Sequence, residues 1–194
     1  MARRLRPVGL DFTETAPVRL VFVARAAAPP EAVYRALAQE VTGWPQWFGA
    51  VTLARPTRDG AGREIGLVGG IRFQETIMAS DPGRRYAYRV DETNAPGVRA
   101  LLEEWQLTAV GPATADGAAG TTGGTTRATG ATGATGTADS GDGATGTLVR
   151  WTFAADGPAP FRLALSAARP GLGHSFRTAV RALDARLTSP PRNR

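Results

Sequence analysis

The sequence of 194 residues contains no cysteine and no lysine, and it has a single histidine, His174. Without cysteine the chain has no disulfide, no thiolate metal ligand and no cysteine nucleophile. One histidine also excludes a zinc site built from several histidines. We therefore expect a protein that works without a metal or an organic cofactor.

Long apolar runs are absent as well. No stretch approaches the roughly 18 consecutive apolar residues that a membrane-spanning helix needs. The first residues, MARRLRPVGLDF, lack the apolar segment of a signal peptide. These absences predict a cytoplasmic protein without stable membrane insertion.

The net charge of +6 comes from 23 basic residues, all of them arginine, against 17 acidic ones. A nucleic-acid-binding surface needs clustered basic residues that neutralise phosphates. Here the arginines are scattered over predicted strands, turns and both ends of the chain, and no nucleic-acid-binding motif is recognisable. We therefore expect no nucleic-acid partner.

The length and the hydrophobic share of 42% fit one domain with a sizeable core. Residues 1–16 show no clear period and are predicted to form a flexible arm before a single domain at 17–188. Residues 111–146 consist almost entirely of Gly, Ala and Thr, which cannot bury enough apolar surface to fold, so they predict a disordered loop. Residues 189–194 form a polar tail.

The periodicity of the apolar residues predicts the order of the elements. A strand over 18–25 is followed by a helix that Pro29 and Pro30 open, and then by the aromatic turn GWPQWF at 43–48. Alternation with a period of two then predicts an antiparallel meander that continues on both sides of the 111–146 loop. After Pro170 a helix begins with one apolar stripe, formed by Leu172, Phe176, Val180, Leu183 and Leu187.

Alternation places most of the large aromatic residues on one face of the predicted sheet. Plain core packing and the lining of a ligand pocket are alternative roles for this face. Tyr and Trp carry polar atoms that need partners when buried, a combination common in ligand pockets. The aromatic candidates for ligand contact on this face and on the last helix are Phe73, Tyr86, Tyr88, Trp105, Trp151, Phe153 and Phe176.

Glu75 and Glu103 share the inward phase of their strands, each with apolar residues two positions away. A buried carboxylate must find a partner or take up a proton. In one interpretation a bulge turns them to solvent, or an arginine such as Arg150 pairs with them across the sheet. In the other they orient a ligand or act as general acid and base, with Tyr86 or Tyr88 donating to a ligand carbonyl.

The order of elements is that of the helix-grip fold. With APPEAVYRAL and GWPQWF near the start, FQETIMASDPGRRYAYRV in the middle and GTLVRWTF before the last helix, the sequence resembles the START-like (SRPBCC) superfamily, particularly its polyketide cyclase/dehydrase-like branch. The resemblance covers about residues 18–187. It implies an α+β fold, in which a curved antiparallel β-sheet wraps around a long C-terminal α-helix.

The resemblance also implies a mostly apolar cavity between the sheet and the last helix, which takes a hydrophobic small molecule such as a lipid, a polyketide or an isoprenoid. In this interpretation Trp47 and Phe48 cap the cavity, and Trp44 packs against the first helix. Because the fold hosts many functions, the function has to be argued from the site.

Three hypotheses remain open. The first is a protein that binds a hydrophobic small molecule, and the second is a cofactor-independent polyketide cyclase or dehydratase that uses Glu75, Glu103, Tyr86 and Tyr88. The third is a protein-interaction module, in which GWPQWF forms an exposed aromatic patch. A core without a void would favour interaction, a void lined only by apolar groups would favour carriage, and a void with convergent Glu and Tyr would favour catalysis.

Overall fold

The computed structural model describes residues 2–111 and 146–189. The predictions for the 111–146 loop and the 189–194 tail therefore fall almost entirely outside the described residues. The elements in chain order are β1 (Arg3–Arg4), α1 (Phe12–Thr15), β2 (Val18–Ala26), α2 (Pro30–Tyr34), a π-helical turn (Arg35–Gln39), a 3-10 turn (Val41–Gln46), β3 (Val51–Thr57), a 3-10 turn (Arg58–Gly60), β4 (Gly62–Leu67), a 3-10 turn (Val68–Gly70), β5 (Arg72–Asp81), β6 (Arg85–Thr93), β7 (Ala100–Val110), β8 (Gly146–Asp156), α3 (Ala159–Ala167) and α4 (Arg169–Thr188).

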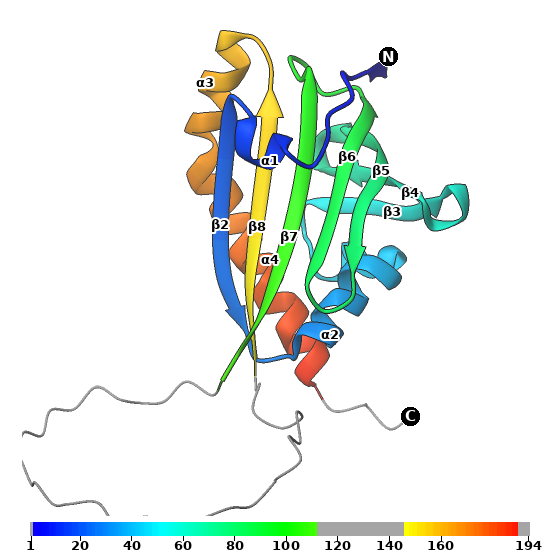
Figure 1. Cartoon of the computed structure of the whole chain (residues 1–194), viewed down its shortest axis with the longest axis vertical. Helices are drawn as coiled ribbons and strands as arrows, with labels where there is room; N and C mark the ends of the chain where they lie inside the picture. Colours follow the sequence, from blue (N-terminus) through cyan, green and yellow to red (C-terminus); the bar gives the residue numbers. More distant parts are fainter. Residues whose placement is uncertain (1, 112–145, 190–194) are drawn as a thin grey trace, which may run out of the picture.

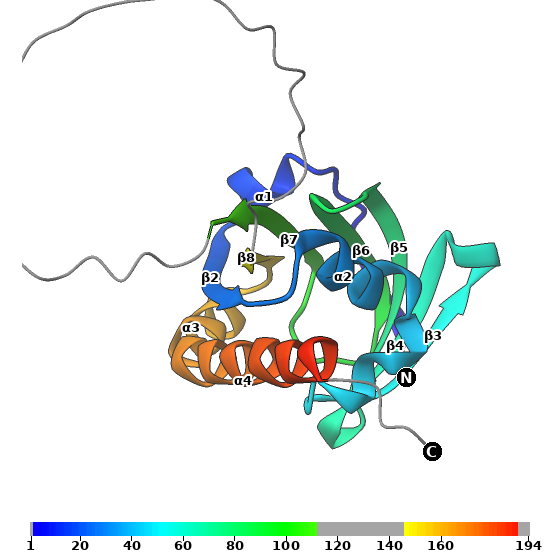
Figure 2. The ribbon, with the colours of Figure 1, turned by 90° about the horizontal axis from the view of Figure 1, so that it is seen from below.

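The strands form one curved antiparallel sheet in the order β2-β8-β7-β6-β5-β4-β3, with the short β1 added beside β6. Seen from below, the strands form an arc and α4 runs across its open side (Figure 2). The strand order is that of a meander in which β2 closes on β8. The predicted α+β helix-grip fold is confirmed.

The last helix supplies the inner layer of the core. Pro170 lies in the first turn of α4, where its missing N–H costs no helical hydrogen bond. The predicted apolar stripe faces the sheet: Phe176, Val180 and Leu183 are buried, and Leu172 and Leu187 pack partly buried against the same core. In contrast, α3 contains no buried residue.

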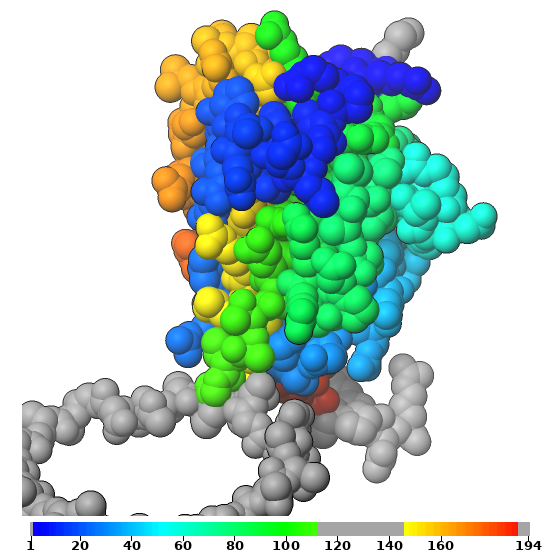
Figure 3. Space-filling model, viewed as in Figure 1, coloured from blue at the N-terminus to red at the C-terminus, as the bar shows by residue number. Residues whose placement is uncertain are grey.

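The flexible arm expected at residues 1–16 is wrong for the residues that the structure describes. β1 pairs with β6, and α1 lies on the outer face of the sheet, on the side opposite α4 (Figures 1 and 2). In the space-filling view this segment covers part of the strands (Figure 3). The physical reason is a second apolar cluster, in which Val8 and Phe12 cover Ala100, Leu102 and Ala154.

Candidate functional site

A cavity of about 200 Å³ lies between the inner face of the sheet and α4. Every strand from β3 to β8 contributes to its wall, together with the aromatic turn and the first turns of α4. Most of the lining is apolar, and only a few polar side chains reach it. The lining residues are Trp44, Phe48, Ala50, Val51, Arg63, Ile65, Leu67, Phe73, Glu75, Tyr88, Glu103, Trp151, Phe153, Leu172 and Ser175.

The aromatic turn forms part of this wall and is itself buried. Trp44, Trp47 and Phe48 are only 2%, 3% and 7% exposed. The indole N–H of Trp44 donates at 3.0 Å to the carbonyl of Leu37, in the π-helical turn that continues α2, the helix that the sequence predicts as its partner; Trp44 also lines the cavity. Trp47 does not line the cavity; its ring lies 4.9 Å from that of Trp44. The exposed aromatic patch of the interaction hypothesis is therefore not present at this turn.

The strand register builds the polar part of the cavity from two pairs of directly opposed residues. Arg63 on β4 faces Glu75 on β5, and Tyr88 on β6 faces Glu103 on β7. In an antiparallel pair such opposed side chains leave the same face of the sheet and contact each other. The result is a row of four polar side chains on the inner face.

Arg63 is buried to 1% exposure and forms an ion pair with Glu75, to which its Nε donates. Its guanidinium carbon lies 4.1 Å from the ring centre of Trp44, 3.7 Å from that of Tyr88 and 5.4 Å from that of Tyr86. Such contacts with ring faces stabilise a desolvated cation. Its Nη1 has no hydrogen-bond partner among the described residues. Arg150, the partner considered from the sequence, is exposed on β8.

Glu103 is held by a chain of hydrogen bonds among aromatic side chains. The hydroxyl of Tyr88 donates to Oε2 of Glu103 at 2.8 Å, and the indole N–H of Trp151 donates to the same oxygen at 3.0 Å. The indole N–H of Trp105 donates in turn to the Tyr88 hydroxyl at 2.9 Å. Glu103 is thus fixed at the cavity wall by two direct donors, Tyr88 and Trp151, and Trp105 in turn holds Tyr88 in place.

Burial, together with the nearby charge of Glu75, raises the pKa of Glu103 to about 7. Burial also raises the pKa of Glu75, although the Arg63 cation acts against that rise. Burial opposes the charge on Arg63, but Glu75 and the tyrosines outweigh it, so the pKa of Arg63 lies above its ordinary value. With one cation between two carboxyls, Glu103 is the group that exchanges a proton near neutral pH.

The cavity brings together many of the residues predicted from the sequence. Those that line it are Phe48, Phe73, Glu75, Tyr88, Glu103, Trp151 and Phe153. The other predicted residues, Trp47, Tyr86, Trp105 and Phe176, are buried in the core around it without lining it. For Tyr86, burial raises the pKa, and its ring lies beside that of Tyr88 at 5.6 Å.

Sequence reasoning missed Arg63, the main polar residue of the site. It lies in the stretch RDGAGRE, which indicates a turn. In the structure β4 already begins at Gly62, one residue before Arg63. A period of two was nevertheless available as a signal, because Arg63, Ile65 and Leu67 share one face and the latter two are apolar.

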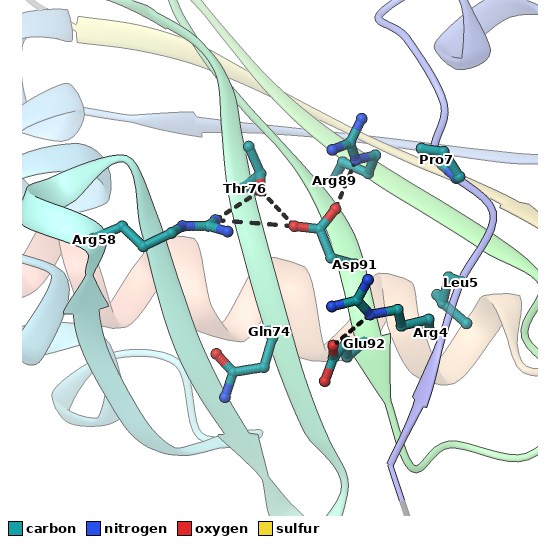
Figure 4. Close-up of a pocket in the computed structure, with 9 residues that line it drawn as sticks. All are labelled: Arg4, Leu5, Pro7, Arg58, Gln74, Thr76, Arg89, Asp91 and Glu92. Atoms are coloured by element: carbon teal, nitrogen blue, oxygen red, sulfur yellow. Dashed lines mark hydrogen bonds and ion pairs between the residues drawn. The ribbon is translucent and has the colours of Figure 1, made fainter.

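A larger hollow of about 530 Å³ lies on the outer face, beside the N-terminal segment (Figure 4). Its side chains are mostly polar, and its three arginines meet acids. Arg58 and Arg89 lie 3.9 and 2.8 Å from Asp91, and Arg4 lies 3.1 Å from Glu92. The hollow therefore has little unmatched charge, and only Leu5 and Pro7 give it an apolar lining, in contrast to the cavity under α4.

Two further properties concern the described part of the chain only. Its histidine and acidic side chains form no group of three that could hold a metal ion. None of its helices combines the length and the apolar character that crossing a membrane requires.

Comparison with known proteins agrees with this geometry. The sequence pattern of the family described as "Polyketide cyclase / dehydrase and lipid transport" matches residues 17–188. Uncharacterised proteins of Mycobacterium tuberculosis and Mycobacterium bovis are 34% identical over 108 residues, which cover 53% of this chain and 64% of theirs. The match thus spans less than two thirds of those relatives.

Solved structures show the same fold. A START superfamily protein from Mycobacterium smegmatis superposes with a TM-score of 0.56 at 10% identity, covering 87% of this chain and 96% of that one. The protein XoxI from Bacillus cereus gives 0.58 at 15% identity, covering 88% and 95%. Together with the family match, these likenesses confirm the START-like resemblance predicted from the sequence.

Proposed function

This chain belongs to the polyketide cyclase, dehydrase and lipid transport family, and we propose that it binds a hydrophobic small molecule in the cavity between its sheet and α4. The observation that carries the proposal is the cavity itself, a partly open, mostly apolar space with a few convergent polar groups. That combination is typical of small-molecule sites. Family membership supports hydrophobic ligand binding in general, and the apolar lining supports this cavity as the proposed place.

The size of the cavity restricts the ligand. Its volume of about 200 Å³ is below the roughly 300–1,000 Å³ of most ligand pockets. Among lipids, polyketides and isoprenoids, it favours a compact molecule over a long acyl chain. Aromatic rings from Trp44, Phe48 and Trp151 line the space, so a flat, unsaturated body would make the most contact.

A pair of matched variants tests the proposal. Leu172 lines the cavity from α4, whereas Leu163 on α3 is 74% exposed. Leu172→Trp should fill the space and weaken binding of an apolar fluorophore by at least tenfold, while Leu163→Trp should leave it unchanged. Native mass spectrometry of the protein from its own host, followed by denaturing extraction, would identify a bound molecule. Equal fluorophore binding by both variants would place the ligand elsewhere.

A second candidate function, a cofactor-independent cyclase or dehydratase, is favoured by one observation. Glu103, whose pKa lies at about 7, reaches the cavity wall beside Arg63 and Tyr88. A carboxyl that gains and loses a proton near the working pH is suited to general acid–base catalysis. Of the three hypotheses left open by the sequence, a void with convergent Glu and Tyr side chains favours catalysis.

This candidate is tested with the molecule recovered by extraction. The protein would be incubated with it, and products that have lost one water or closed a ring would be sought by mass spectrometry. Glu103→Gln should abolish such turnover but retain binding. Glu104→Gln is the control, because Glu104 belongs to an ion pair with Arg85 and does not line the cavity. Turnover that survives in Glu103→Gln would remove Glu103 from the chemistry.

A further inference from the structure

The cavity contains a buried cation with an unused hydrogen-bond donor. Arg63 is 1% exposed and lines the cavity, and its Nε is occupied by Glu75. The rings of Trp44, Tyr86 and Tyr88 surround the guanidinium, but none of their polar atoms is a hydrogen-bond partner of Nη1. Nη1 therefore has no acceptor among the described residues. Buried donors in native proteins are almost always paired, so an orphan donor on a residue that lines a cavity indicates an acceptor that comes with a ligand.

A second polar atom is available on the same wall. Both hydrogen bonds to Glu103, from Tyr88 and from Trp151, go to its Oε2. No hydrogen bond from a described residue reaches Oε1. When Glu103 is protonated, Oε1 can carry the proton and donate it, because Oε2 already accepts two hydrogens. Arg63 and Glu103 then present two donors to the ligand.

The charge balance decides what kind of oxygen meets these donors. Arg63 provides one positive charge, and Glu75 already pairs with it. A carboxylate or phosphate on the ligand would add a further negative charge beside two buried carboxyls, at a high desolvation cost. An alcohol could accept from Nη1, but its own proton also needs an acceptor, and Oε1 of Glu103 is a good acceptor only when the carboxyl is ionised. A carbonyl oxygen only accepts, and it is uncharged.

We propose that the inner end of the ligand is an uncharged carbonyl oxygen, which accepts one hydrogen bond from Nη1 of Arg63 and one from the protonated carboxyl of Glu103. The inference rests on the proposed binding function, because it concerns the ligand of the same cavity. It assigns Arg63 and Glu103 as the residues that select the polar end of the ligand, while the aromatic wall takes its apolar body.

Binding of such a ligand is linked to the protonation of Glu103. The titratable side chains that face Glu103 at the cavity are Arg63 from β4, Glu75 from β5 and Tyr88 from β6, while the lining residues of β8 and α4 carry no titratable group. Because the ligand binds the protonated form, the apparent affinity falls as that form is depleted. Above the pKa of Glu103, at about 7, the affinity should drop about tenfold per pH unit.

The first experiment compares three probes of similar shape on the full chain by fluorescence titration. They are methyl naphthyl ketone, isopropenylnaphthalene, which has a methylene in place of the carbonyl oxygen, and naphthoate, which is anionic. Below the pKa of Glu103, the ketone should bind on the order of ten to a hundred times more tightly than the alkene, the range expected for a hydrogen bond to a charged donor. Naphthoate should bind more weakly than the ketone.

Two variants connect the selectivity to its residues. Glu103→Gln keeps a neutral donor at the wall, so it should retain ketone binding and lose the pH dependence. Arg63→Met should reduce ketone affinity towards that of the alkene. The matched control is Glu104→Gln, the neighbouring carboxylate outside the cavity lining, which should behave as the native protein does. If Arg63→Met does not fold, the comparison of the three probes and the Glu103→Gln variant still test the carbonyl anchor.

The outcomes separate the two proposals. If no probe binds at any pH, the proposed binding function fails. If the ketone and the alkene bind equally, or naphthoate binds best, the cavity binds ligands but the carbonyl anchor is overturned. A pH dependence of ketone binding that persists unchanged in Glu103→Gln would also overturn it. The proposal is supported if the native protein prefers the ketone and this preference weakens above neutral pH, while the preference of Glu103→Gln does not change with pH.

Discussion

Glu103 should make the stability of the unliganded protein depend on pH. Its carboxyl has an ordinary pKa of 4.5 in the unfolded chain and a pKa of about 7 in the folded protein, where it is buried. The folded state therefore binds the proton more tightly. Its contribution is fully present below pH 4.5 and is lost as pH rises through about 7. Glu103→Gln removes the titrating group and keeps the shape of the side chain.

The magnitude follows from the size of the shift. A rise from 4.5 to about 7, at 1.36 kcal/mol per unit, corresponds to about 3 kcal/mol in total. Integrating the linkage between about pH 5 and pH 8 gives a loss of about 2.5 kcal/mol from this group. Because Glu103 is 7% exposed, solvent screening leaves most of this effect in place.

The assay is urea denaturation followed by tryptophan fluorescence, performed on the native protein and on Glu103→Gln across that pH range. All other titrating groups are common to both proteins, so the difference between their free energies of unfolding isolates Glu103. Relative to the variant, the native protein should lose stability as pH rises. A difference that is constant with pH, or that changes in the opposite direction, would refute the assignment of Glu103 as a buried carboxyl with a raised pKa.

Further predictions concern stability at neutral pH and use the same denaturation assay. Glu75→Gln leaves its buried arginine partner without a counter-charge and should cost about 3–5 kcal/mol, whereas Glu92→Gln removes an exposed ion pair and should cost below about 1 kcal/mol; equal losses would contradict the buried pair. Phe176→Ala removes a fully buried ring that stacks on Trp151 at 5.7 Å and should cost about 3–5 kcal/mol; a loss below this range would mean that the ring is loosely packed. Gly83→Ala forces a Cβ onto a residue at φ 67°, 3.0 Å from a Glu31 oxygen, and should cost about 1–2 kcal/mol; an unchanged midpoint would argue against this turn.

The inward phase of the strands was predictable because a period of two needs only local sequence. Glu75, Tyr88 and Glu103 were assigned to the inner face, and the structure has all three at the cavity wall. Likewise the stripe on α4 follows from apolar spacings of three and four. These patterns identify the face that is buried, since a shift by one residue would expose the whole apolar set.

Other features could not be obtained in this way. Arg63 follows two glycines in a turn-like stretch, and only its register opposite Glu75 shows that it is buried. Trp47 was expected at the cavity mouth, but its position depends on how the 3-10 turn packs against β3. The N-terminal segment was expected to be free, yet the outer face of β7 and β8 carries apolar residues that it covers.

By itself, the sequence determined the kinds of elements, their order, their buried faces and, through its motifs, the family. These depend on short-range periodicity and on residue types. The tertiary structure decided which side chains meet across strands, and therefore the ion pair of Arg63 with Glu75, the hydrogen bonds that hold Glu103 and the space left under α4. The physical reason is that the pKa of a carboxyl, the pairing of a cation and the volume of a cavity depend on distances between residues far apart in the chain, which only the packed sheet and helix bring together.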